Sequence, residues 1–315
     1  MINRRAFIIG LKSTTLLEKE KSFLKKYKPW GVILFSRNID NIHQANKLTS
    51  SIRNVFKDKK YPILVDQEGG RVNRLEKIIS FESFTSKFFG DIFSKDKKKF
   101  SFLYKLFIDK NSYLLNKIGI NINTVPVLDL NVEGSSKIIG DRSFSHNPKI
   151  SSKIGDYCIK NFHENKIGTV IKHIPGHGHA KSDSHKFTPK INKKLNFLKK
   201  NDFLVFKNKK SLFAMTAHII FNQIDKTNTV THSSKLINLI RSEIGYKNLI
   251  ISDDLSMKSL KGSLKENTTK AFDAGVNIVL HCNGNYREME IIGRNSPLID
   301  KFIIKKTSQF YKILS

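Results

Sequence analysis

Cysteine, acidic residues and long hydrophobic runs are all scarce in this sequence. Only two cysteines, Cys158 and Cys282, occur in 315 residues. That number excludes a disulfide-stapled secreted fold and fits a reducing compartment such as the cytoplasm. No apolar run approaches the roughly 20 residues that cross a bilayer. No internal repeat or low-complexity linker divides the chain, so we expect one domain over residues 1–315.

Acidic residues number 27 against 56 lysines and arginines, which gives a formal net charge of +29. Such an excess can indicate a nucleic-acid-binding protein. Here, however, the lysines are scattered in short runs, and no basic stretch alternates with aromatic residues that could stack on bases. We therefore expect lysines on solvated helix faces, no nucleic-acid or membrane partner, and a monomer. The charge would still favour an anionic small-molecule substrate.

The first residues combine paired arginines with a short apolar run, as some export signals do. The run from Ala6 to Leu11 is shorter than the usual apolar region of about 7–15 residues, and no small-residue cleavage site follows. We therefore interpret residues 5–9 as a first buried strand, which Gly10 ends.

Short apolar runs rich in isoleucine and valine recur along the chain, as expected of strands buried on both faces. They span residues 5–9, 31–35, 62–66, 122–128, 168–173, 212–218, 248–254 and 276–282. Stretches with helical spacing lie between them, at residues 14–27, 41–56, 97–119, 151–168, 232–245, 265–275 and 299–314. This alternation predicts a (β/α)8 barrel. The alternative is a doubly wound open sheet, but the turn IIGLKS after the first strand is not a glycine-rich phosphate loop.

Polar residues collect where the predicted strands end, and active sites of (β/α)8 barrels lie at that rim. The third strand is followed by DQEGGRVNR, in which Asp66 is well placed to bind paired hydroxyls. Arg74 and Lys172, at the end of the fifth strand, would be its cationic partners. Glu68 and Arg71 could instead form a structural ion pair.

The seventh predicted strand ends in two adjacent acids, Asp253 and Asp254. Two carboxylates at a barrel rim are costly unless at least one is used or paired. One of them could cap the following helix. Asp253 lies nearer the strand end, so we expect its side chain to point into the barrel mouth.

The segment IKHIPGHGHAKSDSHKFTP, residues 171–189, follows the fifth strand and is rich in histidine. A metal site on His173, His177, His179 and His185 is one interpretation. Its glycines, however, suggest a loop that moves rather than one that clamps an ion. In the other interpretation, Asp183 bonds to His185, fixes its tautomer and raises its basicity, which gives a general acid–base on a mobile loop.

The motifs DQEGGRVNR, KHIPGHGHAKSDSH, TAHI and SDDLSM, in this order and spacing, resemble the NagZ-type β-N-acetylglucosaminidases of glycoside hydrolase family 3. GVILFSRNI and GDRSF are similar to further parts of the same pattern, so the resemblance spans nearly the whole chain. It implies a cytoplasmic enzyme without metal or organic cofactor. Its implied substrate is β-linked N-acetylglucosamine joined to an anhydro-muramic acid, with or without a peptide, from cell-wall turnover.

The resemblance also implies roles for individual residues. Asp253 would be the nucleophile that forms a covalent glycosyl-enzyme, and His185, with Asp183 as its dyad partner, the general acid and then base. An imidazole suits a group that donates and then accepts a proton, although retaining glycosidases commonly use two carboxylates. If the acid were a carboxylate, Glu68 would be the candidate. The residues implied to hold the sugar are Asp66, Arg74, Arg142, Lys172 and His173, with His218 near the ring.

Three alternatives remain open from the sequence. A metal-dependent hydrolase would use the histidine cluster and lose activity to a chelator. A phosphorylase would keep the same residues but use phosphate instead of water as the acceptor. A non-catalytic basic binding protein would bind DNA in a salt-sensitive way and turn over no sugar.

Overall fold

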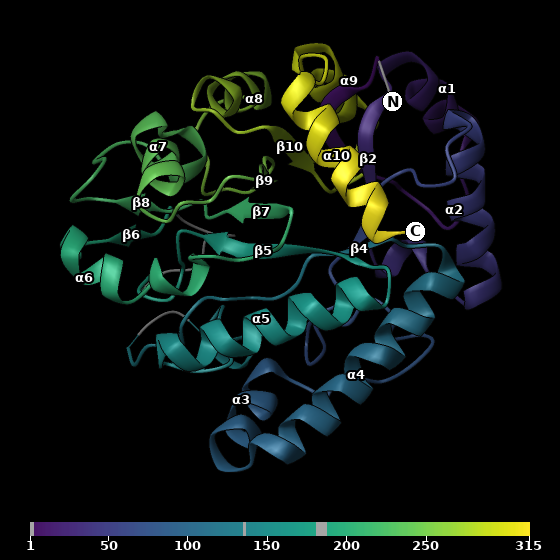
Figure 1. Ribbon diagram of the computed structural model, residues 1–315. Coiled ribbons are helices and arrows are strands. Elements are labelled where there is room, and N and C mark those ends of the chain that lie inside the picture. Colours follow the sequence, from purple (N-terminus) through teal and green to yellow (C-terminus); the bar gives the residue numbers. More distant parts are fainter. Residues whose placement is uncertain (1–2, 135–136, 181–187) are drawn as a thin grey trace.

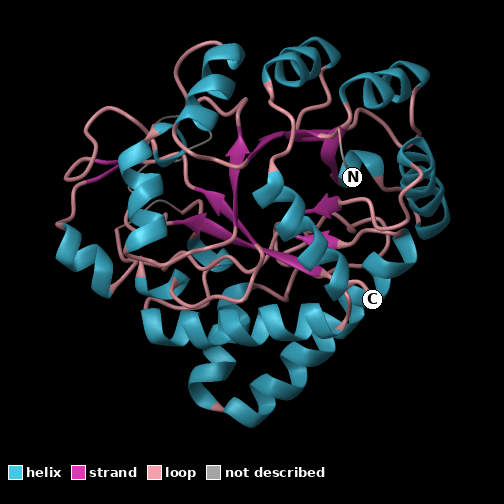
Figure 2. Cartoon of the chain, turned by 45° about the horizontal axis from the view of Figure 1, so that its top comes forward, coloured by secondary structure: helices cyan, strands magenta, loops and turns pink. Residues whose placement is uncertain are grey.

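The computed structural model of the protein describes residues 3–134, 137–180 and 188–315. Eight parallel strands close into a barrel in the order β1-β10-β9-β7-β5-β4-β3-β2, and helices surround it (Figures 1 and 2). The predicted (β/α)8 barrel is therefore confirmed. The barrel strands are β1 (Arg5–Gly10), β2 (Pro29–Leu34), β3 (Ile63–Val65), β4 (Ile122–Asn123), β5 (Gly168–Ile174), β7 (Phe213–Thr216), β9 (Leu249–Asp254) and β10 (Ile278–His281).

The helices lie outside the barrel and are mostly capped by short polar side chains. Asn41, Thr85 and Asp96 cap α2, α3 and α4 in this way. The helices are α1 (Glu18–Tyr27), α2 (Ile42–Phe56), α3 (Ser86–Lys95), α4 (Lys97–Ile118), α5 (Pro148–Glu164), α6 (Leu195–Lys200), α7 (Ser234–Ser242), α8 (Leu264–Asp273), α9 (Tyr286–Asn295) and α10 (Lys301–Ile313). Short 3₁₀ turns are η1 (Ser36–Asn38), η2 (Gly140–Arg142), η3 (Leu204–Phe206) and η4 (Val230–His232).

Alternate residues of each strand point to opposite sides, so the barrel has two apolar layers. In β1, Ile8 belongs to the cluster inside the barrel, whereas Phe7 and Ile9 belong to the layer between strands and helices. Helix α10 covers the amino ends of the strands, where the ring of Phe310 lies 5.5 Å from that of Phe213. The opposite end, at the strand carboxyl termini, is left for polar side chains.

Several boundaries differ from the prediction for identifiable reasons. The fourth strand ends at Asn123 rather than at residue 128, because Pro126 has no N–H for the ladder. Helix α1 begins at Glu18, not at residue 14, since the Glu20 carboxylate accepts hydrogen bonds from the backbone N–H groups of Lys12 and Leu17. A small separate sheet of β6 (Lys190–Ile191) and β8 (Ile220–Phe221) was not predicted.

The first strand is present at Arg5–Gly10, as the sequence interpretation expected. It pairs with β2 on one side and with β10 on the other. Among the helices of the described residues, none is both long enough and apolar enough to cross a membrane.

Candidate active site

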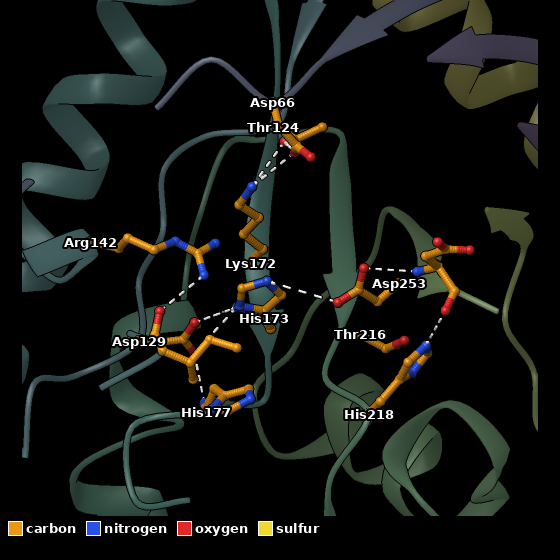
Figure 3. Close-up of polar contacts among 12 residues, drawn as sticks. Asp66, Thr124, Asp129, Arg142, Lys172, His173, His177, Thr216, His218 and Asp253 are labelled. Carbon is orange, nitrogen blue, oxygen red and sulfur yellow. Dashed lines mark hydrogen bonds and ion pairs between the residues drawn. The ribbon is translucent and has the colours of Figure 1, made fainter. Parts of the chain in front are cut away.

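A cavity of about 350 Å³ opens at the carboxyl ends of the strands. Its polar lining comes from β5 and β9 and from the loops that follow β3, β4 and β5 (Figure 3). A larger groove of about 820 Å³, between α1 and α2 on the outside of the barrel, contains none of the predicted site residues. The predicted residues that line the 350 Å³ cavity are Asp66, Arg74, Arg142, Lys172, His173 and Asp253.

The turn that follows β3 is fixed by the neighbouring strand. The Asn123 side chain accepts a hydrogen bond from the Gln67 N–H (2.9 Å) and donates one to the Gln67 carbonyl (2.8 Å). Gly69 has φ +93°, and a Cβ there would lie 2.4 Å from the carbonyl oxygen of Phe84. Only glycine fits both demands. The turn thereby holds Asp66 and Glu68 at the cavity wall.

Asp66 lies between two cations, as predicted. The Lys172 Nζ is 3.0 Å from its Oδ1, and the Arg74 guanidinium is 3.9 Å from its Oδ2. The Thr124 hydroxyl donates a further hydrogen bond to the same carboxylate. Burial alone would raise the pKa of Asp66, but Lys172 and Arg74 lower it below its ordinary value. Asp66 is therefore an ionised acceptor that is still 20% exposed to the cavity.

Glu68 is bound more tightly than Asp66, and not by the partner that the sequence suggested. Arg142 donates two hydrogen bonds to its carboxylate (2.8 and 2.9 Å), and the Lys172 Nζ lies 2.6 Å away. Arg71 instead pairs with Asp141 at 3.1 Å. Although burial opposes ionisation, Arg142 and Lys172 hold the pKa of Glu68 far below its usual range. A carboxylate that stays ionised is unsuited to act as a general acid.

Asp129 is a buried site residue that the sequence analysis missed. Its Oδ2 lies 2.6 Å from the Nδ1 of His173, and its Oδ1 accepts a hydrogen bond of 2.6 Å from the His177 N–H. Burial would raise the pKa of Asp129, but the His173 imidazole lowers it. With Nδ1 bonded to Asp129, the Nε2 of His173 faces Asp253, 4.0 Å from its Oδ2. Asp129 thus sets the orientation of the His173 ring.

The two adjacent acids of β9 have different environments. Asp253 lines the cavity, and its Oδ1 accepts a hydrogen bond of 2.8 Å from the Asp254 N–H. Asp254 points away from the cavity and accepts hydrogen bonds from the N–H and hydroxyl of Ser256 and the N–H of Cys282. Neither acid caps the next helix, because Ser263 caps α8. The expected direction of Asp253 is therefore observed.

His218 does not line the cavity, and Figure 3 shows its ring bonded to the backbone beside Asp253. Its Nε2 is 3.1 Å from the Asp254 carbonyl, and its Nδ1 is 2.7 Å from the Thr231 hydroxyl. Burial lowers the pKa of His218 below its ordinary value. A neutral imidazole with both nitrogens engaged supports the backbone of β9, on which Asp253 is carried.

The histidines in β5 and in the loop that follows it have different partners. His173 bonds to Asp129, whereas His179 bonds to Asp202, with Nδ1 2.9 Å from the carboxylate. Across residues 3–134, 137–180 and 188–315, no three His, Cys, Asp or Glu side chains form a group that could hold a metal ion. Asp183 and His185, predicted as the acid–base dyad, lie outside the described residues.

Of the missed residues, Asp129 carried the same signal as the predicted ones. It directly follows the predicted fourth strand, residues 122–128, whereas Thr124 lies inside that predicted strand and follows the observed β4. The rule that polar residues at strand ends face the site finds Asp129 at the end of the predicted fourth strand. It does not find Thr124, because the predicted strand runs past that residue to residue 128.

Known proteins are similar to this chain in both sequence and fold. Residues 8–306 match the family described as glycosyl hydrolase family 3 N terminal domain. A β-hexosaminidase of Neisseria meningitidis serogroup C is 32% identical over 292 residues, which cover 90% of this chain and 79% of the relative. The structure of NagZ from Neisseria gonorrhoeae in complex with N-trifluoroacetyl-D-glucosamine has a TM-score of 0.87 at 29% identity, over 100% of this chain and 90% of that one. The same protein in complex with zinc ion gives 0.87 at 28% identity, over 98% and 90%.

Proposed function

Because the chain belongs to glycosyl hydrolase family 3, it is a glycoside hydrolase of the β-N-acetylhexosaminidase type, and we propose that it is a retaining exo-β-N-acetylglucosaminidase. Its substrate is a cell-wall fragment in which terminal N-acetylglucosamine is joined to anhydro-muramic acid, with or without a peptide. The reaction belongs to peptidoglycan recycling in the cytoplasm, needs no cofactor, and is carried out by a monomer.

One observation carries this proposal. The carboxylate of Asp253 faces a cavity whose other walls carry Asp66, Arg74 and Lys172. An ionised Asp66 can accept hydrogen bonds from sugar hydroxyls, while the cationic side chains donate to sugar oxygens. The cavity volume of about 350 Å³ lies near the lower end of the range for small-ligand pockets. The relative from N. gonorrhoeae, which binds an N-acylated glucosamine, supports the choice of sugar.

The proposed reaction has two steps. In the first, the Oδ2 of Asp253 attacks the anomeric carbon while the bond to the leaving oxygen breaks, and that oxygen takes a proton from His185. In the second, His185 takes a proton from water as water attacks the same carbon and releases Asp253. Asp183 orients His185 in both steps. The Asp254 N–H, bonded to the Oδ1 of Asp253, keeps the nucleophile aimed at the cavity.

The charge of the whole chain, rather than that of the cavity, supports an anionic substrate. In the cavity, Arg71, Arg74, Arg142 and Lys172 stand with Asp66, Glu68 and Asp253, and Arg71 is paired with Asp141, so the site is close to neutral. The net charge of +29 would add a longer-range attraction, which physiological salt limits to roughly 8 Å. Anhydro-muramic acid fragments carry carboxylates, so they match this field.

The test compares nitrophenol release from the β-N-acetylglucosaminide and from the β-glucoside. We expect selective turnover of the first, unchanged by a chelator and by added phosphate. Asp253→Ala should lower kcat by at least roughly a thousandfold, whereas Asp273→Ala, an exposed acid of α8, should leave it unchanged.

Each other outcome identifies a different chemistry. Loss of activity on addition of a chelator would establish the metal-dependent hydrolase. The zinc complex of a relative is a reason to include this test. A sugar phosphate formed in phosphate buffer would establish a phosphorylase. Full activity of Asp253→Ala would remove the nucleophile from the proposal. A fluorinated N-acetylglucosaminide that adds its mass to the peptide containing Asp253 would show the covalent intermediate directly.

A further inference from the structure

The outer face of α4 carries a line of large apolar side chains that nothing in the described chain covers. Phe102, Leu106 and Tyr113 are 69%, 57% and 55% exposed. Their spacings of four and seven residues place them on one side of the helix, along about 16 Å at 1.5 Å per residue. The opposite side of α4 is buried, through Phe100 and Phe107 among others. Figure 1 shows α4 at an edge of the molecule, beside α3.

Lysines border this apolar line on both sides. At about 100° per residue, Lys98 and Lys105 fall on one flank and Lys99, Lys110 and Lys117 on the other. All five are exposed. The acid of this helix, Asp109, lies on the same side of α4 and is paired with Lys105 at 2.6 Å. This pair is neutral, so the positive charge beside the apolar line comes from Lys98, Lys99, Lys110 and Lys117.

Two of these lysines are held beside an aromatic ring of the line. The Nζ atoms of Lys110 and Lys117 lie 5.8 and 5.6 Å from the centre of the Tyr113 ring. Cations at these distances are attracted to the face of an aromatic ring. Apolar and cationic groups therefore form one continuous surface.

We propose that this face of α4 is a docking site for the surface of an anionic lipid bilayer. A helix that lies in the plane of a bilayer surface places apolar side chains at the headgroup boundary and lysines against the lipid phosphates. The exposed face of α4 has that arrangement, and the net charge of +29 attracts the protein to such a surface. This revises the expectation of no membrane partner, because sequence alone does not separate the exposed from the buried aromatic residues of α4.

Other occupants fit the surface less well. A second copy of the chain would bring two sets of lysines together, which like-charge repulsion opposes. A nucleic acid would use arginine and aromatic platforms, whereas Leu106 stands at the centre of this line. A bilayer needs no concave partner, and the exposed side of a helix offers none.

The experiment is vesicle flotation with the full chain. We expect binding to vesicles of equal parts phosphatidylcholine and phosphatidylglycerol, and none to phosphatidylcholine alone. The variant Phe102→Ser/Leu106→Ser/Tyr113→Ser should bind at least about tenfold more weakly, because the apolar contact is lost.

Two lysine variants with the same change in net charge separate a site from diffuse attraction. Lys99→Gln/Lys110→Gln/Lys117→Gln should lose about a hundredfold in affinity, whereas Lys25→Gln/Lys47→Gln/Lys235→Gln, on other helices, should stay within about twofold. Hydrolysis of the soluble glycoside and the melting temperature should be unchanged in all variants, since every substituted side chain is exposed.

Four results would overturn the proposal. Equal loss in the two lysine variants would mean non-specific attraction, and wild-type affinity of the serine variant would exclude an apolar contact. A dimer in sedimentation velocity that the serine variant abolishes would assign the face to a second copy. Binding to single-stranded DNA that the serine variant abolishes, without vesicle binding, would assign it to nucleic acid.

Discussion

Glu68 is an ionised carboxylate that is paired with two cations, so its loss would affect both. Its carboxylate holds Arg142 and Lys172 at once, and Lys172 also reaches Asp66. Removal of one partner from a buried ion pair leaves the other charges uncompensated. Glu68 therefore acts by positioning the cavity wall, not by exchanging protons.

Glu68→Gln should raise KM by about tenfold or more and lower stability by about 3 kcal/mol, because two buried cations lose their counter-charge. Steady-state kinetics on the nitrophenyl glycoside and urea unfolding measure the two effects. Glu76→Gln, an exposed acid on the same segment, is the matched control and should change neither. A KM equal to that of the wild type would show that the network does not position the sugar site.

Asp129→Asn should also act through a neighbour, since the amide cannot accept the His173 N–H and both backbone N–H bonds as well as a carboxylate does. We expect kcat/KM to fall by about tenfold or more. Asp156→Asn, which alters a half-exposed ion pair with Lys209, serves as control. Unchanged kinetics with a shifted melting temperature would restrict Asp129 to a structural role.

At the residue scale, the sequence predicts which side chains reach the site better than it predicts their partners. Asp66, Lys172 and Asp253 follow apolar runs, so their place at the rim can be read from local pattern. The partner of Glu68 cannot, because Arg142 is 74 residues away and meets it only after the barrel closes. Arg71, three residues away, was the plausible but wrong choice.

At the scale of elements, the turn after β3 depends on one glycine. Gly69→Ala should destabilise the protein by about 2 kcal/mol or more and lower activity, because positive φ and the contact with Phe84 both exclude a Cβ. Gly134→Ala is the matched control, with φ +73° but no atom of the described residues within 4 Å of the added Cβ. It should cost only the backbone strain of about 1–2 kcal/mol and leave kcat/KM unchanged. Equal effects of both changes would show that the contact with Phe84 can relax.

Strands were easier to predict than the connections between them. The barrel strands are apolar on both faces, so each stands out as a short run. The prediction that the fourth strand continues to residue 128 was wrong, because Pro126 interrupts the hydrogen-bond ladder. Val127 still makes an isolated parallel bridge with Lys172. Helices α3, α6 and α9 and the β6–β8 pair were not predicted, because these helices have ten residues or fewer and such short elements are hard to distinguish from loops.

At the scale of the whole molecule, buried histidines should govern stability in mild acid. Burial lowers the pKa values of His163, His177 and His232 from 6.5 to about 4. The unfolded chain therefore binds more protons than the folded chain between these values. The histidine contribution to the free energy of unfolding should be fully present above about pH 6.5. It should fall as the pH is lowered towards 4, by about 1.4 kcal/mol per pH unit for each proton taken up on unfolding.

Urea unfolding between pH 7 and pH 4.5 measures this slope. His163→Gln should remove part of it, because His177, His232 and His218 also contribute, while His43→Gln, at an exposed position of α2, should leave it unchanged. A slope unaffected by His163→Gln would mean that this histidine titrates equally in the folded and unfolded chain.

The closure of the barrel by β1 and β10 also bears on the synthesis of the chain. The partners of β1 are residues 29–33 and residues 279–281, so one edge of the first strand stays unpaired until the last strand, β10, has been synthesised. A ribosome that has not yet released residue 281 holds a sheet with two open edges, and open edges are templates for aggregation. Translation pauses before that point would therefore extend the period in which the nascent protein depends on chaperones.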